Sequence, residues 1–344
     1  MPKIYSELEN WILSEVKPAP ASSVEQTYER LERVRSKMPV IDVPQDLNNE
    51  EHFVEEALIQ DLVNHLRNCE RVLDVGCGDG WPGLRLARFF PSVTGIDASA
   101  RRVAVATENA RRLGLNNVSI SQMSATELEF DRDSFDGVVV VNSVEQTADP
   151  YQALREIFRV LKPGGRLRIY FEGAADSERG ITERVFITTT ERSLGYHYVL
   201  RHQRPPWERN YLVEFVPTPE MKEEFRRLQD LLERLGSVPT QAPEIGLDFL
   251  GKNRAQVMGG SWYEIEHFTS ETMRDTLEEI GFTSVRIIYS AGTFARQFRP
   301  YIAQQQLSAQ QLQAVCQGLA GLARDIGAPL ASGEPVVAVK PERG

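Results

Sequence analysis

The stretch RVLDVGCGDGWPG, residues 71–83, decides the fold class of this 344-residue chain. Its first part, Val72 to Val75, is an apolar run interrupted by one acid, which is typical of a short buried strand. Four glycines follow, and Pro82 stands where its fixed φ suits the first turn of a helix. The stretch therefore predicts a strand, a glycine-rich turn and a helix. In that arrangement the backbone and the free N–H groups of the helix can closely approach a ligand.

Two cofactor classes use such a turn. The last three glycines spell G-x-G-x-x-G, and Asp97 ends the next predicted strand about 20 residues later, where a carboxylate accepts both ribose hydroxyls. That placement suits NAD and S-adenosylmethionine equally well. Asp74 and Asp79 favour S-adenosylmethionine, because carboxylates beside the turn repel a pyrophosphate but attract an ammonium and a sulfonium group.

Four motifs resemble those of the class I S-adenosylmethionine-dependent methyltransferases. LDVGCGDG (73–80) and GIDAS (95–99) resemble the first two motifs of that family. DSFDGVVVVNSVEQTADP (133–150) resembles the fourth-strand motif, and YQALREIFRVLKPGGRL (151–167) resembles the helix and turn before the fifth strand. The nearest branch is the methyltransferase type 11, or ubiquinone/menaquinone-biosynthesis-like, group. The resemblance covers residues 68–172, about a third of the chain, and implies S-adenosylmethionine as the cofactor.

The resemblance also assigns a set of cofactor-binding residues. They are Asp74, Gly76, Cys77, Gly78, Gly80, Asp97, Ala98, Ser124, Ala125 and Asn142. Asp97 is expected to bind the ribose, and Asp74 to organise the turn and help hold the ammonium group. The family commonly has an acid for the adenine amino group where Ser124 stands, so this chain must use a hydroxyl or backbone groups there. For Cys77 the favoured alternative is a small filler inside the loop.

The best catalytic candidate is Glu145, which follows the fourth strand. Methyl transfer from a sulfonium mainly requires alignment and the exclusion of water, and a base only where the acceptor holds its proton firmly. Histidine is common in the family where Glu145 and Gln146 stand, and its absence here excludes a histidine base from this loop. Glu145 could act as the base or hold a cationic substrate. The alternative is a solvated or helix-capping glutamate.

The order of strands and helices predicts an α/β fold with a Rossmann-like, doubly wound, mainly parallel seven-stranded sheet whose last strand is antiparallel. The expected strands are 71–75, 93–97, 118–121, 137–142, 166–172, 285–289 and 335–339. The expected core helices are 82–90, 100–113, 150–161 and 269–280. Four parts are predicted: an N-terminal helical lid (1–67), the cofactor-binding core (68–172), an inserted α+β substrate cap (173–266) and the C-terminal part of the core (267–344).

The regions outside the core have sequence patterns of their own. Residues 1–67 predict three helices, with one beginning after Ser22 and the last at about 50–67. The cap contains two β-like runs (196–200 and 211–215) and a helix (218–235), and it could instead be a dimerisation arm in a homodimer. Polar candidates for a substrate pocket in it are Tyr196, His197, Tyr198, His202, Trp262, Tyr263 and His267, with Arg201, Arg204 and Arg209 as a candidate clamp for an anion. The favoured alternatives are packing or surface positions for the single residues and a solvated hairpin tip for the three arginines. The 295–334 insertion includes a helix near 308–325 and suggests no function.

Composition narrows the function. The net charge of −10 and the pI near 5.2 argue against nucleic acid as a partner. The three cysteines have no metal-ligand spacing, no apolar run approaches a membrane span, and the first residues lack a signal core. We therefore expect a cytoplasmic methyltransferase that uses no metal and acts on a small organic molecule. The alternatives are a protein or RNA methyltransferase, a NAD-dependent oxidoreductase, and a non-catalytic module that binds the cofactor.

Overall fold

A computed structural model describes residues 4–21, 46–171, 181–189, 194–203, 206–235, 244–329 and 334–342. The chain divides into two compact units, which we call the core unit (Lys37–Asp176 with Phe268–Gly344) and the inserted unit (Met1–Ser36 with Ser177–His267). The helix predicted after Ser22 lies outside the described residues.

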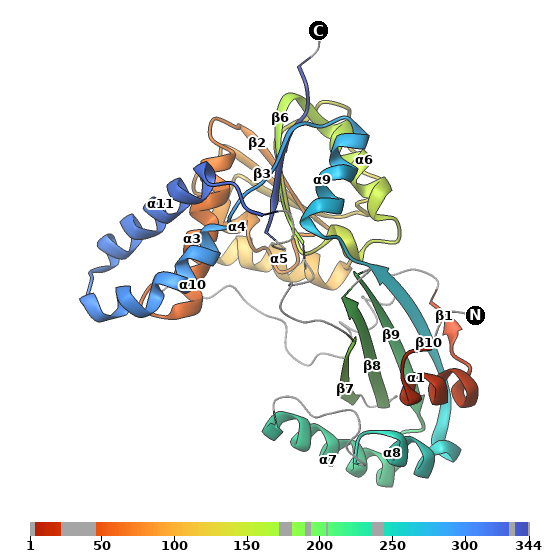
Figure 1. The fold of residues 1–344 in the computed structure, drawn as a ribbon. Coiled ribbons are helices and arrows are strands. Elements are labelled where there is room, and N and C mark those ends of the chain that lie inside the picture. The colour runs from red at the N-terminus through yellow and green to blue at the C-terminus, as the bar shows by residue number, and fades with distance from the viewer. Residues whose placement is uncertain are drawn as a thin grey trace. The chain divides into compact units, whose positions relative to one another are not determined.

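The core unit is built on a seven-stranded sheet with the order β11-β12-β6-β5-β2-β3-β4 (Figure 1). Its strands are β2 (Arg71–Val75), β3 (Ser92–Asp97), β4 (Val118–Gln122), β5 (Phe135–Val141), β6 (Leu161–Tyr170), β11 (Thr283–Ile287) and β12 (Val336–Val339). Five neighbouring strands of the sheet run parallel to one another: β4, β3, β2, β5 and β6. Strand β12 is antiparallel to both of its neighbours, β6 and β11. This confirms the predicted Rossmann-like sheet with its antiparallel last strand.

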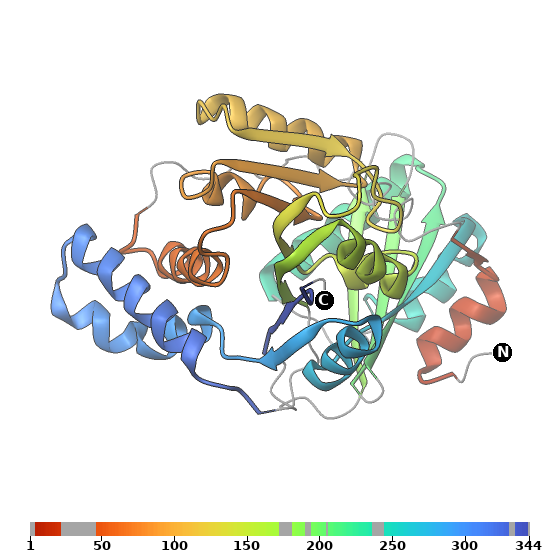
Figure 2. The same ribbon diagram turned by 90° about the horizontal axis from the view of Figure 1, so that it is seen from above.

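Helices cover both faces of this sheet, because its central strands are apolar on both sides (Figure 2). On one face α3 (Glu50–His65) and α4 (Gly83–Leu86) pack on Val72, Val93 and Val139. On the other face α6 (Pro150–Val160) and α9 (Ser270–Ile280) pack on Leu73, Val138 and Leu167. Another helix, α5 (Ala100–Arg112), connects β3 to β4. The carboxyl ends of β2, β3 and β5, where ligands bind in such sheets, therefore lie at one edge.

The helix after the glycine turn is shorter than predicted. The sequence indicated residues 82–90, but α4 ends at Leu86. Beyond that residue, the N–H groups of Arg88 and Phe89 donate to carbonyls three residues back, at 3.4 and 2.8 Å, which is the tighter 3₁₀ pattern. Phe90 is still buried beneath the sheet, so the apolar spacing that predicted a longer helix reflects burial and not helix length.

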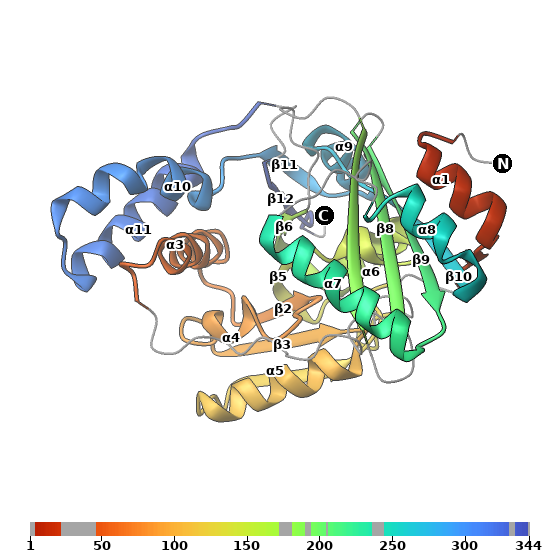
Figure 3. The same cartoon turned by 90° about the horizontal axis from the view of Figure 1, so that it is seen from below.

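Two helices that are additional to the expected core helices pack against α3. These are α10 (Ala291–Ile302) and α11 (Ala309–Asp325), joined through η4 (Ala303–Gln305), and Figure 3 shows both beside α3. The helix predicted near 308–325 is therefore confirmed, whereas α10 was not predicted. Its sequence contains Gly292 and Pro300, which both disfavour a helix interior. Gly292 is required by close packing, since a Cβ there would lie 2.8 Å from Cδ2 of Leu58.

A buried ion pair joins α3, β6 and α10. Arg168 and Asp61 have side chains that are 0% and 1% exposed, and Arg168 Nη2 lies 2.6 Å from Asp61 Oδ2. The same carboxylate oxygen accepts hydrogen bonds from the Tyr170 hydroxyl at 2.6 Å and from the Ala291 N–H at 3.2 Å. One carboxylate therefore fixes three elements that lie far apart in the sequence.

The inserted unit contains a five-stranded sheet with the order β1-β10-β9-β8-β7. Its strands are β1 (Ala19–Pro20), β7 (Ile181–Thr189), β8 (Leu194–Gln203), β9 (Pro206–Phe215) and β10 (Val257–Glu266). Its helices are α1 (Glu7–Trp11), the π-helix η1 (Ile12–Val16), α7 (Pro219–Leu235), α8 (Leu247–Lys252) and the 3₁₀ turn η3 (Arg254–Gln256). The two predicted β-like runs lie in β8 and β9, and the predicted helix is α7, whereas β7 and β10 were not predicted.

The first described residues belong to this inserted sheet. Glu9 is fully buried, and its Oε1 lies 3.0 Å from Arg209 Nη1 and accepts a hydrogen bond from the Tyr211 hydroxyl at 2.7 Å. Its Oε2 accepts from the Tyr5 N–H at 2.7 Å. We call this arrangement the Glu9 tether. The predicted segment 1–67 is thus shared between the two units, since α3 packs on the core sheet. Its role as a lid, and that of 173–266 as a cap, stay predictions.

Candidate cofactor site

The glycine turn after β2 needs glycine at several positions. Gly76, Gly78 and Gly80 have φ values of 76°, 54° and 112°, a region that side chains with a Cβ rarely adopt. A Cβ at Gly76 would lie 2.2 Å from Cβ of Ser143, and one at Gly80 would lie 2.3 Å from Cδ1 of Leu84. The turn is therefore bare backbone packed between β5 and α4, as the sequence predicted for a ligand cradle.

Asp97 lies directly against this turn. Its carboxylate is 8% exposed, and Oδ2 accepts a hydrogen bond from the Gly78 N–H at 2.9 Å while Oδ1 accepts from the Ser99 N–H at 2.9 Å. The carboxylate therefore anchors the turn through both of its oxygens, and its contact with the ribose hydroxyls remains a prediction. The structure thus brings together the two parts of the site, the glycines and the acid, that the sequence separates by about 20 residues.

Asp74 holds the far side of the turn. It is fully buried, and its Oδ2 accepts a hydrogen bond from the Gly83 N–H at 2.9 Å, while Oδ1 has no hydrogen-bond partner among the described residues. Burial raises the pKa of Asp74 well above its usual value; the Gly83 N–H partly opposes this, and the nearby Asp97 and Asp79 add to it. A positively charged ligand group near the turn would stabilise the ionised carboxylate.

This shift makes stability depend on pH. An acid whose pKa is raised by folding makes the protein progressively less stable as the pH rises from the unfolded value, near 3.8, through the raised native value. We expect Asp74→Asn, which keeps an acceptor for the Gly83 N–H, to remove this loss. Urea unfolding without ligand at pH 5 and pH 8 tests it: the variant should gain stability relative to the wild type between the two pH values. If the stability difference between the variant and the wild type is the same at both pH values, Asp74 does not titrate between pH 5 and pH 8.

Cys77 and Ala98, two further residues of the predicted set, make structural contacts. The N–H groups of Gly76 and Cys77 both donate to the Ile96 carbonyl at 2.8 Å, and the Cys77 side chain is 1% exposed. Burial raises the pKa of the Cys77 thiol, so it remains a neutral, packed group. These contacts agree with the filler interpretation. The Ala98 carbonyl accepts from Gln122 Nε2 at 3.0 Å. A cofactor contact by Cys77 or Ala98 remains a prediction.

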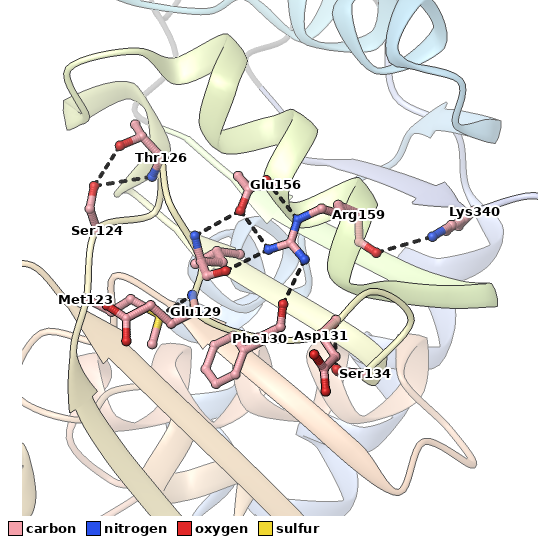
Figure 4. A network of polar contacts seen from close by, with 11 residues as sticks. Met123, Ser124, Thr126, Glu129, Phe130, Asp131, Ser134, Glu156, Arg159 and Lys340 are labelled. Atoms are coloured by element: carbon pink, nitrogen blue, oxygen red, sulfur yellow. Dashed lines mark hydrogen bonds and ion pairs between the residues drawn. The ribbon is translucent and has the colours of Figure 1, made fainter.

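Ser124 and Ala125 lie in the loop after β4. The Ser124 hydroxyl lies 2.8 Å from Oγ1 of Thr126 and accepts a hydrogen bond from the Thr126 N–H at 3.3 Å (Figure 4). The side chain therefore stabilises its own turn. Its role at the adenine is still a prediction.

The same loop is held by α6. Arg159 donates from Nη1 to the Phe130 carbonyl at 2.7 Å and from Nη2 to the Leu128 carbonyl at 2.6 Å, and it pairs with Glu156 at 2.8 Å (Figure 4). Glu156 in turn accepts from the Leu128 N–H at 2.9 Å. Because the pair is only partly exposed, it fixes the loop that carries Ser124 more firmly than a surface ion pair would.

The segment after β5 lies against the glycine turn. Asn142 is exposed, has a left-handed φ of 49°, and donates its N–H to the Tyr170 carbonyl at 3.0 Å. The Ser143 hydroxyl donates to the Val75 carbonyl at 2.6 Å. Sequence reasoning did not assign Ser143 a role, although a small polar residue directly after the fourth strand is the available signal. It locks the end of β5 to the start of the turn.

Glu145 lies in the 3₁₀ turn η2 (Val144–Gln146) and is only 1% exposed. The alternative that it is a solvated glutamate is therefore wrong. Burying an ionised carboxylate costs free energy unless the group is paired or hydrogen-bonded. Its assignment as a base or a cation-holding group remains a prediction.

The polar candidates of the inserted unit are mostly engaged in their own contacts. Tyr196 and Tyr198 are fully buried in its apolar core. Arg201 pairs with Glu208 at 2.7 Å, and Arg209 pairs with Glu264 at 2.6 Å as well as with Glu9. The predicted three-arginine clamp is thus wrong for these two guanidinium groups, because carboxylates already occupy them. Arg204 lies outside the described residues.

Two other candidates, His267 and His202, contact Glu208 and Trp207 of the same unit. Burial opposes it, but the nearby His267, Asn210 and Arg201 lower the pKa of Glu208 to about 2. His267 Nε2 lies 3.8 Å from Glu208 Oε2, and His202 stacks on Trp207 with ring centroids 5.1 Å apart. The distances account for these side chains by packing and ion pairing inside the inserted unit.

The site fits an adenosyl cofactor. The turn leaves no room for side chains at Gly76 and Gly80, and the acid at the end of β3 lies directly against it. Residues 73–169 match the family model described as "Methyltransferase domain". These residues form a class I S-adenosylmethionine-dependent methyltransferase domain. The strand order of the core unit is the independent structural support.

Several known methyltransferases resemble this domain. One is methyltransferase phqN of Penicillium fellutanum, 32% identical over 33% of this chain and 39% of that protein. Another is the 27-O-demethylrifamycin SV methyltransferase of Amycolatopsis mediterranei, 37% identical over 30% of this chain and 39% of its own. A third is the demethylmenaquinone methyltransferase of Listeria welshimeri, 39% identical over 28% and 42% of the respective chains. The alignments thus span about two fifths of each relative.

The glycine turn gives a direct mutational test. We expect Gly76→Ala to destabilise the protein by about 2 kcal/mol or more, because it adds left-handed strain to overlap with Ser143. Cofactor affinity should fall with it. Gly114→Ala is the matched control, since Gly114 has a φ of 66° but nothing within 4 Å of its Cβ position. Urea unfolding of both variants measures how much of the lost stability comes from the overlap with Ser143. Equal losses of unfolding free energy in the two variants would contradict a contribution from that overlap.

Proposed function

We propose that this protein is a methyltransferase that moves the methyl group of S-adenosylmethionine to a small organic molecule. The observation that carries the proposal is the bond between the Asp97 carboxylate and the Gly78 N–H inside the matched domain. It sets an acceptor for ribose hydroxyls next to a backbone cradle, which is what the cofactor requires.

The residues of the site would divide the work of binding. Asp97 accepts the ribose hydroxyls, the backbone of Gly76, Gly78 and Gly80 lies along the methionine part, and Ser124 lies on the adenine side. When bound, the cofactor supplies a methyl group on a positively charged sulfur. Asp79 and Asp74 favour such a cation over a dinucleotide pyrophosphate, because a positive charge beside the turn stabilises the ionised form of the buried Asp74 carboxyl and a phosphate opposes it.

Glu145 is the proposed group on the acceptor side. Its turn follows Ser143, which packs on Gly76, so it belongs to the same edge of the sheet as the cradle. A buried carboxylate there can take a proton from the acceptor or hold a cationic one. The relatives named for a rifamycin and a menaquinone precursor support a small acceptor, as does the acidic balance of the chain. A protein or RNA acceptor is the runner-up.

Glu145→Gln separates binding from catalysis. We expect kcat to fall by about 100-fold if the carboxylate moves a proton, whereas the dissociation constant of S-adenosylhomocysteine should change by less than about threefold. Turnover is measured with the acceptor that a methylation screen yields, and affinity by calorimetry. Unchanged kcat would remove Glu145 from the reaction and leave the cofactor site standing.

A cytoplasmic location and a homodimer remain part of the proposal. Of the helices in the described part of the chain, none is long and apolar enough to cross a membrane.

Calorimetric titration with S-adenosylmethionine, S-adenosylhomocysteine and NADH in parallel tests the proposal. We expect micromolar binding of the two adenosyl compounds and none of NADH. Binding of NADH alone would favour an oxidoreductase and overturn every role given to the turn. Binding of the adenosyl compounds without turnover on any acceptor in a broad screen would favour a non-catalytic module.

A further inference from the structure

The inserted sheet ends in a long strand with a neighbour on one side. β7 stands last in the strand order and pairs antiparallel with β8 over its full length (Figure 1). In an antiparallel ladder every second residue turns its N–H and C=O groups away from the neighbouring strand. Among the described strands, none pairs with these outward groups of β7. A side-chain donor, Gln229 Nε2 on α7, reaches the Ile187 carbonyl at 3.4 Å, which is long for a hydrogen bond. The strand therefore offers a backbone edge to another strand.

The two faces of β7 differ in what they present. Val185 and Ile187 pack into the apolar core of the inserted unit together with Phe225 of α7. Arg184 and Phe186 lie on the opposite face, because side chains alternate along a strand, and both are exposed. Packing inside the inserted unit leaves Phe186 51% exposed. An exposed aromatic residue on a long edge strand favours association with a further strand.

The sequence of β7 is complementary to a second copy of itself. An antiparallel pair about a two-fold axis at Val185 pairs all nine residues of the strand, since Ile181 then faces Thr189 of the second copy. In this register each Arg184 stands opposite Phe186 of the other copy, so the guanidinium can lie on the aromatic ring. A register centred on Arg184 would instead set two like charges opposite each other, which is unfavourable.

The other edge of the inserted sheet does not favour further growth. It ends in β1, which has two residues, and very short edge strands are a common means of preventing further pairing. A symmetric β7 pair uses the long edge of both copies. The assembly therefore closes as a dimer and does not extend into a fibre.

We propose that two copies of this protein associate through β7 and join their five-stranded sheets into one continuous sheet. The inference rests on the homodimer of the proposed function, to which it gives a surface, and is independent of the cofactor and of methyl transfer. Because a contact between two strands is small, the dimer should dissociate with a constant on the order of 10 µM.

Sedimentation equilibrium of the full-length protein between about 1 and 100 µM tests the association. The mass should rise from 38.9 kDa towards twice that value. Phe186→Lys should weaken association by about 10-fold or more, because it places a second cation opposite Arg184. Phe186→Lys combined with Arg184→Glu should restore association to within about threefold of the wild type, since opposite charges then face each other. A monomer at every concentration, or a dimer that Phe186→Lys leaves unchanged, would overturn the proposal.

Phe298→Lys is the matched control, because Phe298 is 43% exposed but lies on α10 of the core unit. It should leave association unchanged, and equal weakening by the two lysine variants would overturn the assignment to β7. Thermal unfolding of each variant shows that it is folded. The affinity for S-adenosylhomocysteine is measured on the same samples, so a failed dimer with intact cofactor binding refutes this inference alone.

Cysteine variants test the register. A mixture of Arg184→Cys and Phe186→Cys proteins should form disulfide-linked dimers on mild oxidation, because directly opposite Cα atoms lie about 5 Å apart, within reach of a disulfide. Either variant alone places its new thiols diagonally, at about 7–8 Å, and should link much less. The three native cysteines are buried and should contribute little. Efficient linking of Phe186→Cys with itself would overturn the register centred on Val185.

Discussion

Replacing Asp97 with alanine is expected to reduce the affinity for S-adenosylhomocysteine by about 100-fold or more, because the proposed site loses both of its charge-assisted hydrogen bonds to the ribose. The change also removes the acceptor for the Gly78 and Ser99 N–H groups. The turn that forms the cradle thus loses its anchor in the same step, which adds to the loss. Isothermal titration calorimetry measures the affinity.

The control for this variant is Glu108→Ala on the neighbouring helix. Glu108 pairs with Arg111 and Arg112 at the surface, so its removal should leave cofactor affinity unchanged. Urea unfolding should show that Asp97→Ala remains folded, with a stability loss of about 1–3 kcal/mol from the two N–H groups. Wild-type affinity in a folded Asp97→Ala variant would refute the placement of the cofactor site.

The second large effect concerns stability alone. Asp61→Ala is expected to lower the free energy of unfolding by about 3–5 kcal/mol, because it leaves the guanidinium of Arg168 buried without a counter-charge. It also removes the acceptor for the Tyr170 hydroxyl and the N–H at the start of α10. Chemical denaturation followed by circular dichroism measures the loss.

A paired variant separates the charge from the packing. Asp61→Leu combined with Arg168→Met replaces both charges by apolar groups of similar length, and such replacements of buried ion pairs are often neutral or stabilising. We therefore expect the double variant to recover most of the stability lost by Asp61→Ala. If it unfolds as readily as the single variant, the shape of the network matters more than its charge.

The core was predictable because its signals are local. The run around Val72 and Val75, the glycines and Asp97 each follow from strand burial or turn geometry, and the mainly parallel sheet follows from alternating strands and helices. The contact between Ser143 and Gly76 was not predictable in this way. It joins two strand ends that are adjacent only in the folded sheet.

The inserted unit was predicted less completely, for a physical reason. Strand β10 contains Gly259 and Gly260, and glycine weakens the sequence pattern of a strand. Gly259 lies at an irregularity in the strand register. Gly260 has the Leu212 carbonyl 2.5 Å from its Cβ position, so glycine is needed there because a neighbouring strand approaches closely. The part of the site on the acceptor side remains a prediction for the same reason, since it depends on contacts and not on local pattern.

The Glu9 tether has a consequence for how this protein can be divided. The inserted sheet draws β1 and the Glu9 carboxylate from the start of the chain and its other strands from the middle, so it is one folding module written in two separate pieces. Removing residues 1–21 would leave Arg209 buried without the Glu9 carboxylate. Grafting this module onto another methyltransferase would therefore require both pieces to be transplanted together, because neither piece alone supplies the Glu9 carboxylate and the Arg209 guanidinium.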